Sequence, residues 1–122
     1  MSERDERLFV KLYIDASRSG LIADIGAERW HTLSTLATFM DEKGECYPSQ
    51  ELLAHRLGVK TREAVNRRIK ALCDYRWNGE PLVVKRRVRG KRQVFANNVY
   101  RLTSVSPFKI FGAPETYKQF TM

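Results

Sequence analysis

The chain of 122 residues is 43% apolar and 30% charged, with 7 Gly and 4 Pro; it can form one hydrophobic core, and this excludes both a disordered chain and two ordinary domains. No apolar run approaches the roughly 20 residues of a membrane span, and no secretion signal follows Met1. Two cysteines cannot make the disulfide framework of a small secreted protein. We therefore expect a soluble cytoplasmic protein with no membrane partner. The net charge of +8 is segregated, because residues 1–55 hold 6 Lys/Arg and 10 Asp/Glu whereas residues 56–122 hold 16 and 4, which favours a polyanion-binding face over a generally solvated basic surface.

The N-terminal third predicts an extended segment followed by a helix. Apolar residues alternate from Leu8 to Ile14 with the period of a strand or extended arm, and Ser17 to Gly20 interrupts the pattern. From Ala27 to about Glu42 the apolar residues recur every three or four positions, which predicts an amphipathic helix. Gly44 follows that helix and is expected to stop it.

Two further helices follow closely. Ser49 is predicted to cap a helix that ends at Gly58 and buries a face drawn from Leu52, Leu53, Ala54 and Leu57. After a tight turn, a third helix is expected from about Thr61 to Arg76. Its apolar positions lie within one narrow arc: Val65, Ile69 and Leu72. The opposite side carries polar and basic residues: Glu63, Asn66, Arg67, Lys70 and Asp74.

The remainder predicts a hairpin and a tail. Trp77 to Pro81 has the composition of a turn, and two strands are expected at about 82–88 and 93–102, joined by the tip Arg89 to Arg92. We expect three parts: an extended arm at residues 1–19, the folded domain at 20–103 and a tail at 104–122, whose structure the sequence leaves unassigned.

The order helix, helix, tight turn, helix and basic hairpin is typical of a winged helix-turn-helix domain, an α+β fold with a three-helix core and a β-hairpin wing. Ala54 allows two helices to cross closely, and Gly58 permits the turn between them. Any compact three-helix domain could show the same apolar stripe. The basic hairpin is what favours the winged fold, in which one helix braces the recognition helix that enters the major groove.

Four short segments carry a resemblance to a known family. They are Gly44-Glu-Cys-Tyr-Pro-Ser-Gln50, Leu52-Leu-Ala54, Leu57-Gly-Val59 and Asn98-Val-Tyr100-Arg-Leu102. Together the chain resembles, over about residues 7–103, the winged helix-turn-helix domain of plasmid and phage replication initiators and related regulators of Gram-positive bacteria. The turn from Gly58 to Val65 is one residue longer than that pattern, and Trp77 to Pro81 lengthens the link before the wing. The resemblance implies origin binding in DNA replication, with transcriptional regulation as the alternative.

Two groups of residues are the candidate DNA contacts. The recognition helix offers Lys60, Thr61, Arg62, Asn66, Arg67 and Lys70, and the wing offers Lys85, Arg86, Arg87, Arg89, Lys91 and Arg92. Asn can pair bidentately with adenine and Arg with guanine, while the arginine-rich wing suits phosphate and a narrow minor groove. Because strand residues alternate faces, Lys85, Arg87 and Arg89 are expected on one side of the hairpin and Arg86 on the other. The plain alternative is a solvated edge whose charges prevent aggregation.

No pattern points to catalysis, a metal or a cofactor. His31 and His55 lie 24 residues apart without a ligand-spaced Cys or His, and no Gly-x-Gly or P-loop is present. Cys46 and Cys73 are expected to be small buried hydrophobes. We therefore expect a non-enzymatic protein that binds double-stranded DNA. Two alternatives remain: a winged module that docks other replication proteins, and a protein that binds structured RNA.

The two ends of the chain carry apolar surface that a small domain has to cover. The segment Leu8 to Ile14 is apolar on both faces apart from Lys11, and the tail holds Phe108, Phe111, Tyr117 and Phe120. Either these ends fold back onto the domain, or exposed Phe108, Phe111 and Phe120 mark the interface of a homodimer. A dimer would match a repeated or palindromic DNA site.

Overall fold

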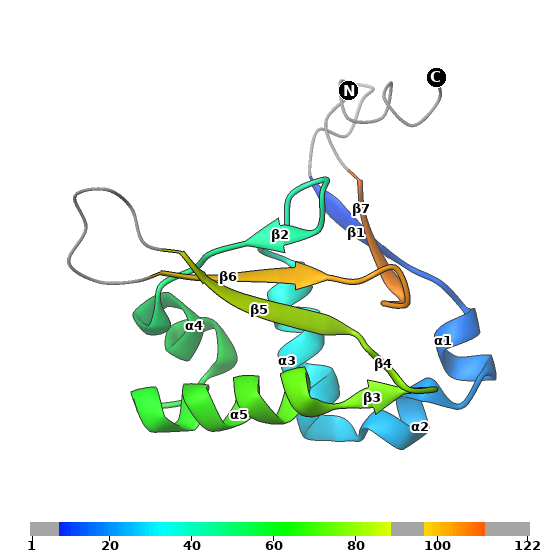
Figure 1. Ribbon diagram of the computed structural model, residues 1–122, viewed down its shortest axis with the longest axis horizontal. Helices are drawn as coiled ribbons and strands as arrows, with labels where there is room; N and C mark the ends of the chain where they lie inside the picture. Colours follow the sequence, from blue (N-terminus) through cyan, green and yellow to red (C-terminus); the bar gives the residue numbers. More distant parts are fainter. Residues whose placement is uncertain (1–7, 89–96, 112–122) are drawn as a thin grey trace, which may run out of the picture.

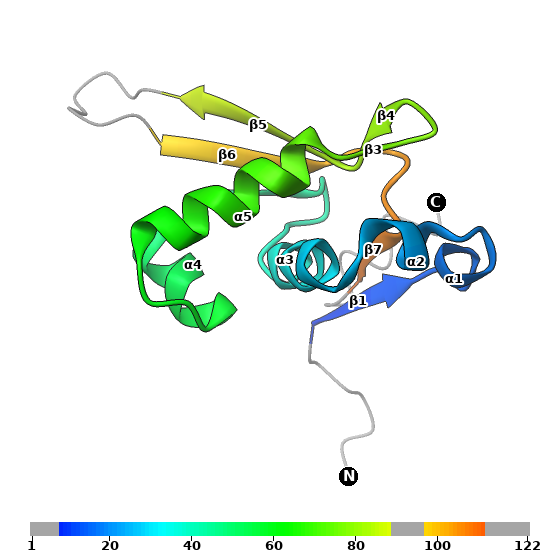
Figure 2. The same cartoon turned by 90° about the horizontal axis from the view of Figure 1, so that it is seen from below.

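The computed structural model describes residues 8–88 and 97–111 of the chain. In chain order the elements are β1 (Phe9–Leu12), α1 (Asp15–Arg18), α2 (Leu21–Ile25), α3 (Ala27–Ala37), β2 (Glu45–Cys46), α4 (Gln50–Leu57), α5 (Arg62–Asp74), β3 (Arg76–Trp77), β4 (Glu80–Pro81), β5 (Val83–Val88), β6 (Asn97–Leu102) and β7 (Phe108–Phe111). An antiparallel sheet of order β2-β6-β5 covers one side of α3 and α5 (Figures 1 and 2). The fold is therefore a mixture of helix and sheet.

The N-terminal region contains two short helices, α1 and α2, where the sequence predicted only a break. Their inward positions supply buried Ala16, Leu21 and Ile25 to the core. Gly20 joins the two helices with φ 92°, a left-handed conformation that a residue with a side chain rarely adopts. Tertiary burial thus stabilises helices too short for sequence periodicity to reveal.

The helix α3 ends at Ala37, whereas the sequence predicted that it continues to about Glu42. The next three N–H groups, of Thr38, Phe39 and Met40, donate to carbonyls three residues earlier at 3.1, 2.9 and 3.2 Å. These tighter bonds close the helix in a 3₁₀-type turn. The turn brings Met40 into the core and leads the chain into β2.

The predicted start of α4 is confirmed, and its predicted buried face is partly wrong. The hydroxyl of Ser49 accepts from the N–H of Leu52 at 3.0 Å, as expected of a cap. Leu53 and Leu57 are buried, but the side chain of Leu52 is exposed. Leu53 and Leu57 lie four residues apart on one helix face, and Leu52 lies about 100° away from Leu53, outside that face.

The helix α5 lies against α3, α4 and β5. It buries Val65, Ile69 and Leu72, as the apolar spacing predicted. Both helices and strands contribute to the core around them, which includes Leu33, Leu36, Leu53, Leu82, Val83 and Tyr100. Burial of the ring raises the pKa of Tyr100 above its usual value.

The link after α5 is a small hairpin rather than the simple turn that the sequence predicted. Trp77 pairs with Glu80 across β3 and β4. Between them Asn78 and Gly79 have φ values of 54° and 82°. Two successive left-handed residues form the two-residue turn that matches the twist of paired strands.

The second predicted hairpin is formed by β5 and β6, which pair from Val83↔Leu102 to Val88↔Asn97. The strand β5 begins at Val83, one residue after the predicted start of about 82. The strand β6 ends at Leu102, as predicted, and residues 93–96 of its predicted span lie outside the described residues. The predicted tip lies outside the described residues, and so do three candidate DNA contacts, Arg89, Lys91 and Arg92.

The two ends of the chain meet in a two-stranded antiparallel sheet. Here β1 pairs with β7, in a register from Phe9↔Phe111 to Leu12↔Phe108. Phe108 is only 8% exposed, and its ring centroid lies 5.3 Å from that of Trp30. The expectation that Phe108 is exposed for an interface is therefore wrong, because its ring packs on α3. The side chains of Phe111 and Phe120 are outside the described part.

Within the residues that the structure describes, no helix combines the length and apolar character needed to cross a membrane.

Replacing Phe108 by Ala tests whether β7 belongs to the core. We expect a loss of about 3 to 5 kcal/mol in the free energy of unfolding, measured by urea denaturation, because the ring leaves a cavity against Trp30. Lys109→Ala on the same strand is the control and should change stability by less than about 0.5 kcal/mol, because Lys109 is exposed. Equal effects of the two substitutions would contradict the packing.

Candidate nucleic-acid interface

The turn between α4 and α5 is closed by backbone hydrogen bonds. Gly58 has φ 75° and its N–H donates to the carbonyl of His55 at 3.2 Å, while the N–H of Val59 donates to Ala54 at 3.0 Å. This left-handed ending is typical of helices that stop at glycine. It reverses the chain within Gly58 to Thr61, so that α5 can pack across α4.

The outward face of α5 carries the residues that the sequence singled out. Its exposed side chains are Arg62, Glu63, Asn66, Arg67, Lys70 and Asp74, and Lys60 and Thr61 are exposed just before the helix. The buried stripe on the opposite side fixes this orientation. The face therefore offers guanidinium, amide, hydroxyl and carboxylate groups at helical spacing, which is the set that can pair with base edges and phosphates.

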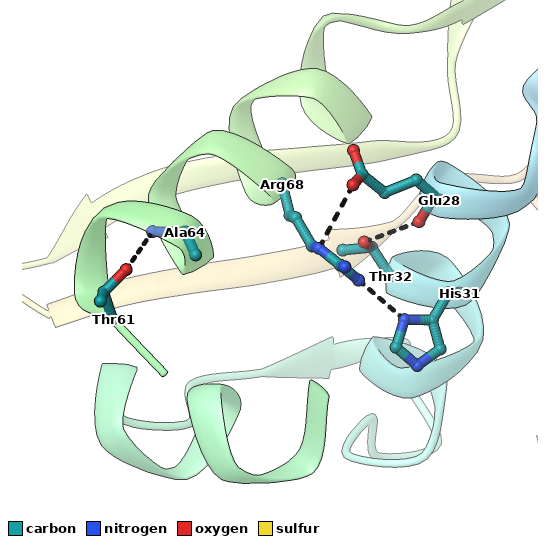
Figure 3. A network of polar contacts seen from close by, with 6 residues as sticks. All are labelled: Glu28, His31, Thr32, Thr61, Ala64 and Arg68. Carbon is teal, nitrogen blue, oxygen red and sulfur yellow. Dashed lines mark hydrogen bonds and ion pairs between the residues drawn. The ribbon is translucent and has the colours of Figure 1, made fainter. Parts of the chain in front are cut away.

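Thr61 is the N-cap of α5, and its hydroxyl accepts one hydrogen bond within the helix. Its hydroxyl oxygen accepts from the N–H of Ala64 at 3.0 Å (Figure 3). A hydroxyl can donate as well as accept, so the same group can still donate its hydrogen to an oxygen outside the helix. The capping contact also holds this hydroxyl at the positive end of the helix dipole.

Lys70 is already engaged on the surface. Its ammonium nitrogen lies 2.6 Å from the Oδ2 atom of Asp74, one helical turn later. This hydrogen bond raises the pKa of Lys70 and lowers the pKa of Asp74. The local neutralisation makes Lys70 a weaker anion contact than Arg62 or Arg67, for which the described part of the structure gives no ion pair.

The basic hairpin, formed by β5 and β6, divides its cations between two faces. Lys85 and Arg87 alternate with Arg86 and share the face of buried Val83, which is the side of the helices. Arg86 points to the other face, where its guanidinium nitrogen lies 3.5 Å from the Oε2 atom of Glu45 on β2. The predicted alternation is thus confirmed for Lys85, Arg86 and Arg87, whereas Arg89 lies outside the described residues. Arg86 is separated from the two cations on the helix side.

The two candidate surfaces reach the same end of the molecule. The N-terminal end of α5 and the Val88 end of β5 both lie at the left in Figures 1 and 2. A ligand that follows the outward face of α5 can therefore also meet the basic hairpin.

Arg68 is the cation of α5 that sequence reasoning missed. Its side chain is 19% exposed and crosses to α3, where Nη1 lies 2.8 Å from Nδ1 of His31 and Nε lies 3.6 Å from Oε2 of Glu28 (Figure 3). Arg68 follows Val65 by three residues and precedes Ile69, so it borders the buried stripe. That position was the signal that it braces the helix rather than facing outward.

A second contact anchors the C-terminal end of α5. The hydroxyl of Tyr75 donates to Oδ2 of Asp24 at 2.6 Å, and the guanidinium of Arg29 lies 4.9 Å from the Tyr75 ring centroid. Burial of the phenol, and then its hydrogen bond to Asp24, raise the pKa of Tyr75 to about 12. These contacts and the Arg68 brace hold α5 on α2 and α3.

The residues weighed for catalysis or metal binding are dispersed. His31 faces Arg68, while His55 is exposed on α4. Burial, and then the charge of Asp41, raise the pKa of the Cys46 thiol to about 12, and Cys73 is half-buried. Among the described residues, no three His, Cys, Asp or Glu side chains gather in a group that could hold a metal ion.

Comparison with known proteins adds one finding. A family model described as a helix-turn-helix domain matches residues 32–77, which run from within α3 to the end of β3 and include α4, the turn and α5. The comparisons with curated proteins and with solved structures give no significant match. The matched segment supports a DNA-binding helix-turn-helix domain, and the basic hairpin follows it in the chain.

Replacing Arg68 by Met tests the brace, because methionine retains an apolar stem and removes the charge. We expect the free energy of unfolding to fall by about 1 kcal/mol through the lost contacts to His31 and Glu28. The neighbouring Arg67→Met is the control and should stay within about 0.5 kcal/mol, because Arg67 is exposed. Chemical denaturation measures the free energy of unfolding of both variants. A larger loss of this free energy for Arg67→Met than for Arg68→Met would contradict the bracing role of Arg68.

Proposed function

We propose that the chain binds a specific sequence of double-stranded DNA as a winged helix-turn-helix domain. The observation that carries the proposal is the exposed polar and basic face of α5, next to Lys85 and Arg87 of the hairpin and within a segment that matches a helix-turn-helix domain. The major groove is wide enough for one α-helix. We assign no catalytic step to the chain, which acts by binding.

In this proposal α5 reads bases from its N-terminal half. Arg62 and Arg67 carry the planar fork that pairs with guanine, and Asn66 carries the amide that pairs with adenine. Glu63 can accept from the amino group of cytosine. Thr61 donates its hydroxyl hydrogen to a phosphate, and Lys60 adds a charge beside it. Lys70 can contact the DNA backbone only after its ion pair with Asp74 is broken.

The hairpin acts as the wing and supplies contacts that do not depend on sequence. Lys85 and Arg87 contribute from the helix side of β5. Arg89, Lys91 and Arg92 follow in the sequence at the tip and are proposed to join them. Arginine suits phosphate oxygens and a narrow minor groove, so this surface supports affinity and register more than base choice.

The biological role we propose is origin binding by a plasmid- or phage-type replication initiator. Its support is the resemblance of the segments Gly44 to Gln50, Leu57 to Val59 and Asn98 to Leu102. A transcriptional regulator would use the same surface. Selection of bound sequences from random duplex DNA, followed by mapping of the preferred site to origins or promoters, separates the two roles.

Salt dependence tests the electrostatic part of the proposal. If about six phosphates are neutralised, affinity for duplex DNA should fall roughly a thousandfold between 50 and 200 mM salt, because counterions are released on binding. Fluorescence anisotropy with labelled duplex measures this slope, and the same measurement with a structured RNA competitor provides the comparison. Salt-insensitive binding, preference for RNA, or association with replication proteins alone would contradict the assignment.

Substitutions separate base reading from backbone contact. Asn66→Ala or Arg67→Ala should cost about 1 to 3 kcal/mol on the preferred site and relax its sequence preference, whereas Arg87→Ala should weaken binding to all sequences alike and flatten the salt slope. Arg86→Ala is the matched control for Arg87, because it is the adjacent arginine on the other face and is paired with Glu45. Equal effects of Arg86→Ala and Arg87→Ala would contradict the proposed orientation of the wing.

A further inference from the structure

Apolar side chains gather along β1 although this strand lies at the rim of the molecule. Of the nine large hydrophobic side chains that are exposed in the described residues, five belong to Leu8 to Ile14. Among these five, the most exposed are Leu8 at 74% and Ile14 at 68%. A cluster of this kind on a small domain marks an interaction surface more often than a solvated one.

The backbone of β1 offers a second edge. The N–H of Tyr13 donates to the carbonyl of Pro107 at 3.0 Å, which identifies the side of the strand that faces β7. Backbone groups in an antiparallel pair alternate between the two sides. The N–H and C=O groups of Leu8, Val10 and Leu12 therefore point away from β7, and the described residues contain no strand that pairs with β1 on that side.

A pocket lies beside the same strand. It has a volume of about 220 Å³ and is lined by Leu8, Phe9, Val10, Ala37, Thr38 and Met40. Its walls are the start of β1 and the C-terminal end of α3. An apolar side chain that approaches along the strand edge can enter it.

We propose that a second copy of this chain pairs with β1 in an antiparallel, two-fold arrangement. A two-fold interface requires each copy to offer both a protruding group and the matching recess. Here the exposed leucines and the apolar pocket belong to one strand, so each copy can fill the recess of the other.

The outward backbone groups and the position of Lys11 select one register. With Val10 opposite the partner's Val10, Leu8 lies opposite the partner's Leu12, and all the outward backbone groups of these residues find partners. Lys11 then lies opposite the partner's Phe9. A shift of the centre to Lys11 would place two lysines opposite each other, which destabilises a strand pair.

The dimer adds the symmetry of the DNA target to the proposed function, and this part of the inference rests on that function. Figure 2 shows α3 between β1 and α5, so a contact through β1 leaves the outward face of α5 and the basic hairpin uncovered in both copies. Two such faces related by a two-fold axis recognise two half-sites of inverted sequence. The partner is thus a second copy of the chain, and the DNA target is a palindromic or inverted-repeat duplex.

Light scattering of the full chain without DNA tests the association. We expect a mass of twice the 14.2 kDa of one chain, and a return to the single-chain mass for Leu8→Asp and for Leu12→Asp. Tyr47→Asp is the matched control, since Tyr47 is as exposed as Leu8, at 74%, but lies far from β1 in sequence and should remain dimeric. A wild-type chain that stays at 14.2 kDa at every concentration overturns the proposal, whatever the result with DNA. So does dissociation by Tyr47→Asp alone.

Disulfide cross-linking tests the register with variants that alter single edge residues. Directly opposed residues in a hydrogen-bonded pair have Cα atoms about 5.5 Å apart, within the range of a disulfide, whereas diagonal neighbours lie about 7 to 8 Å apart. We therefore expect Val10→Cys to form a covalent dimer on mild oxidation and Lys11→Cys to remain uncross-linked. The wild type, with its own Cys46 and Cys73, is the control. Cross-linking of Lys11→Cys without Val10→Cys overturns the proposed register.

Discussion

The burial of one side of α5 is the constraint on which the candidate interface depends. Val65, Ile69 and Leu72 are almost completely removed from solvent between α3, α4 and the sheet. Exposing any of them would cost the apolar transfer free energy of a whole side chain, about 1.5 to 3 kcal/mol. The helix therefore cannot rotate about its axis, and its buried stripe is what holds the polar groups of Asn66 and Arg67 outward.

The same constraint gives neighbouring cations different roles. Arg67 and Arg68 are adjacent and chemically identical, yet about 100° of helical rotation separates them, so that one faces solvent and the other reaches Glu28 and His31 on α3. In the basic hairpin the strand period has an equivalent effect, because Arg87 shares the helix side and Arg86 meets Glu45 on the other. Whether a cation is available to a polyanion depends on its position within the helix or strand, and the count of cations in a segment does not show this.

The two-stranded sheet of β1 and β7 links α3, on which α5 packs, to the ends of the chain. Phe108 packs on Trp30 of α3, the helix that also receives Arg68. The end segments are thus part of the scaffold that positions α5. Their outer edge is the one apolar surface along which we propose association, and it lies across α3 from the outward face of α5.

Features that depend on near neighbours in the chain could be predicted from the order of the amino acids. The stripe of α5, the cap at Ser49 and the turn at Gly58 follow from helical periodicity and local hydrogen bonding, so the helix-turn-helix and its outward residues could be predicted. The short helices α1 and α2, the burial of Phe108 and the inward role of Arg68 became visible only in the folded chain. Each of these depends on packing or charge contacts between segments distant in sequence, which no local pattern records.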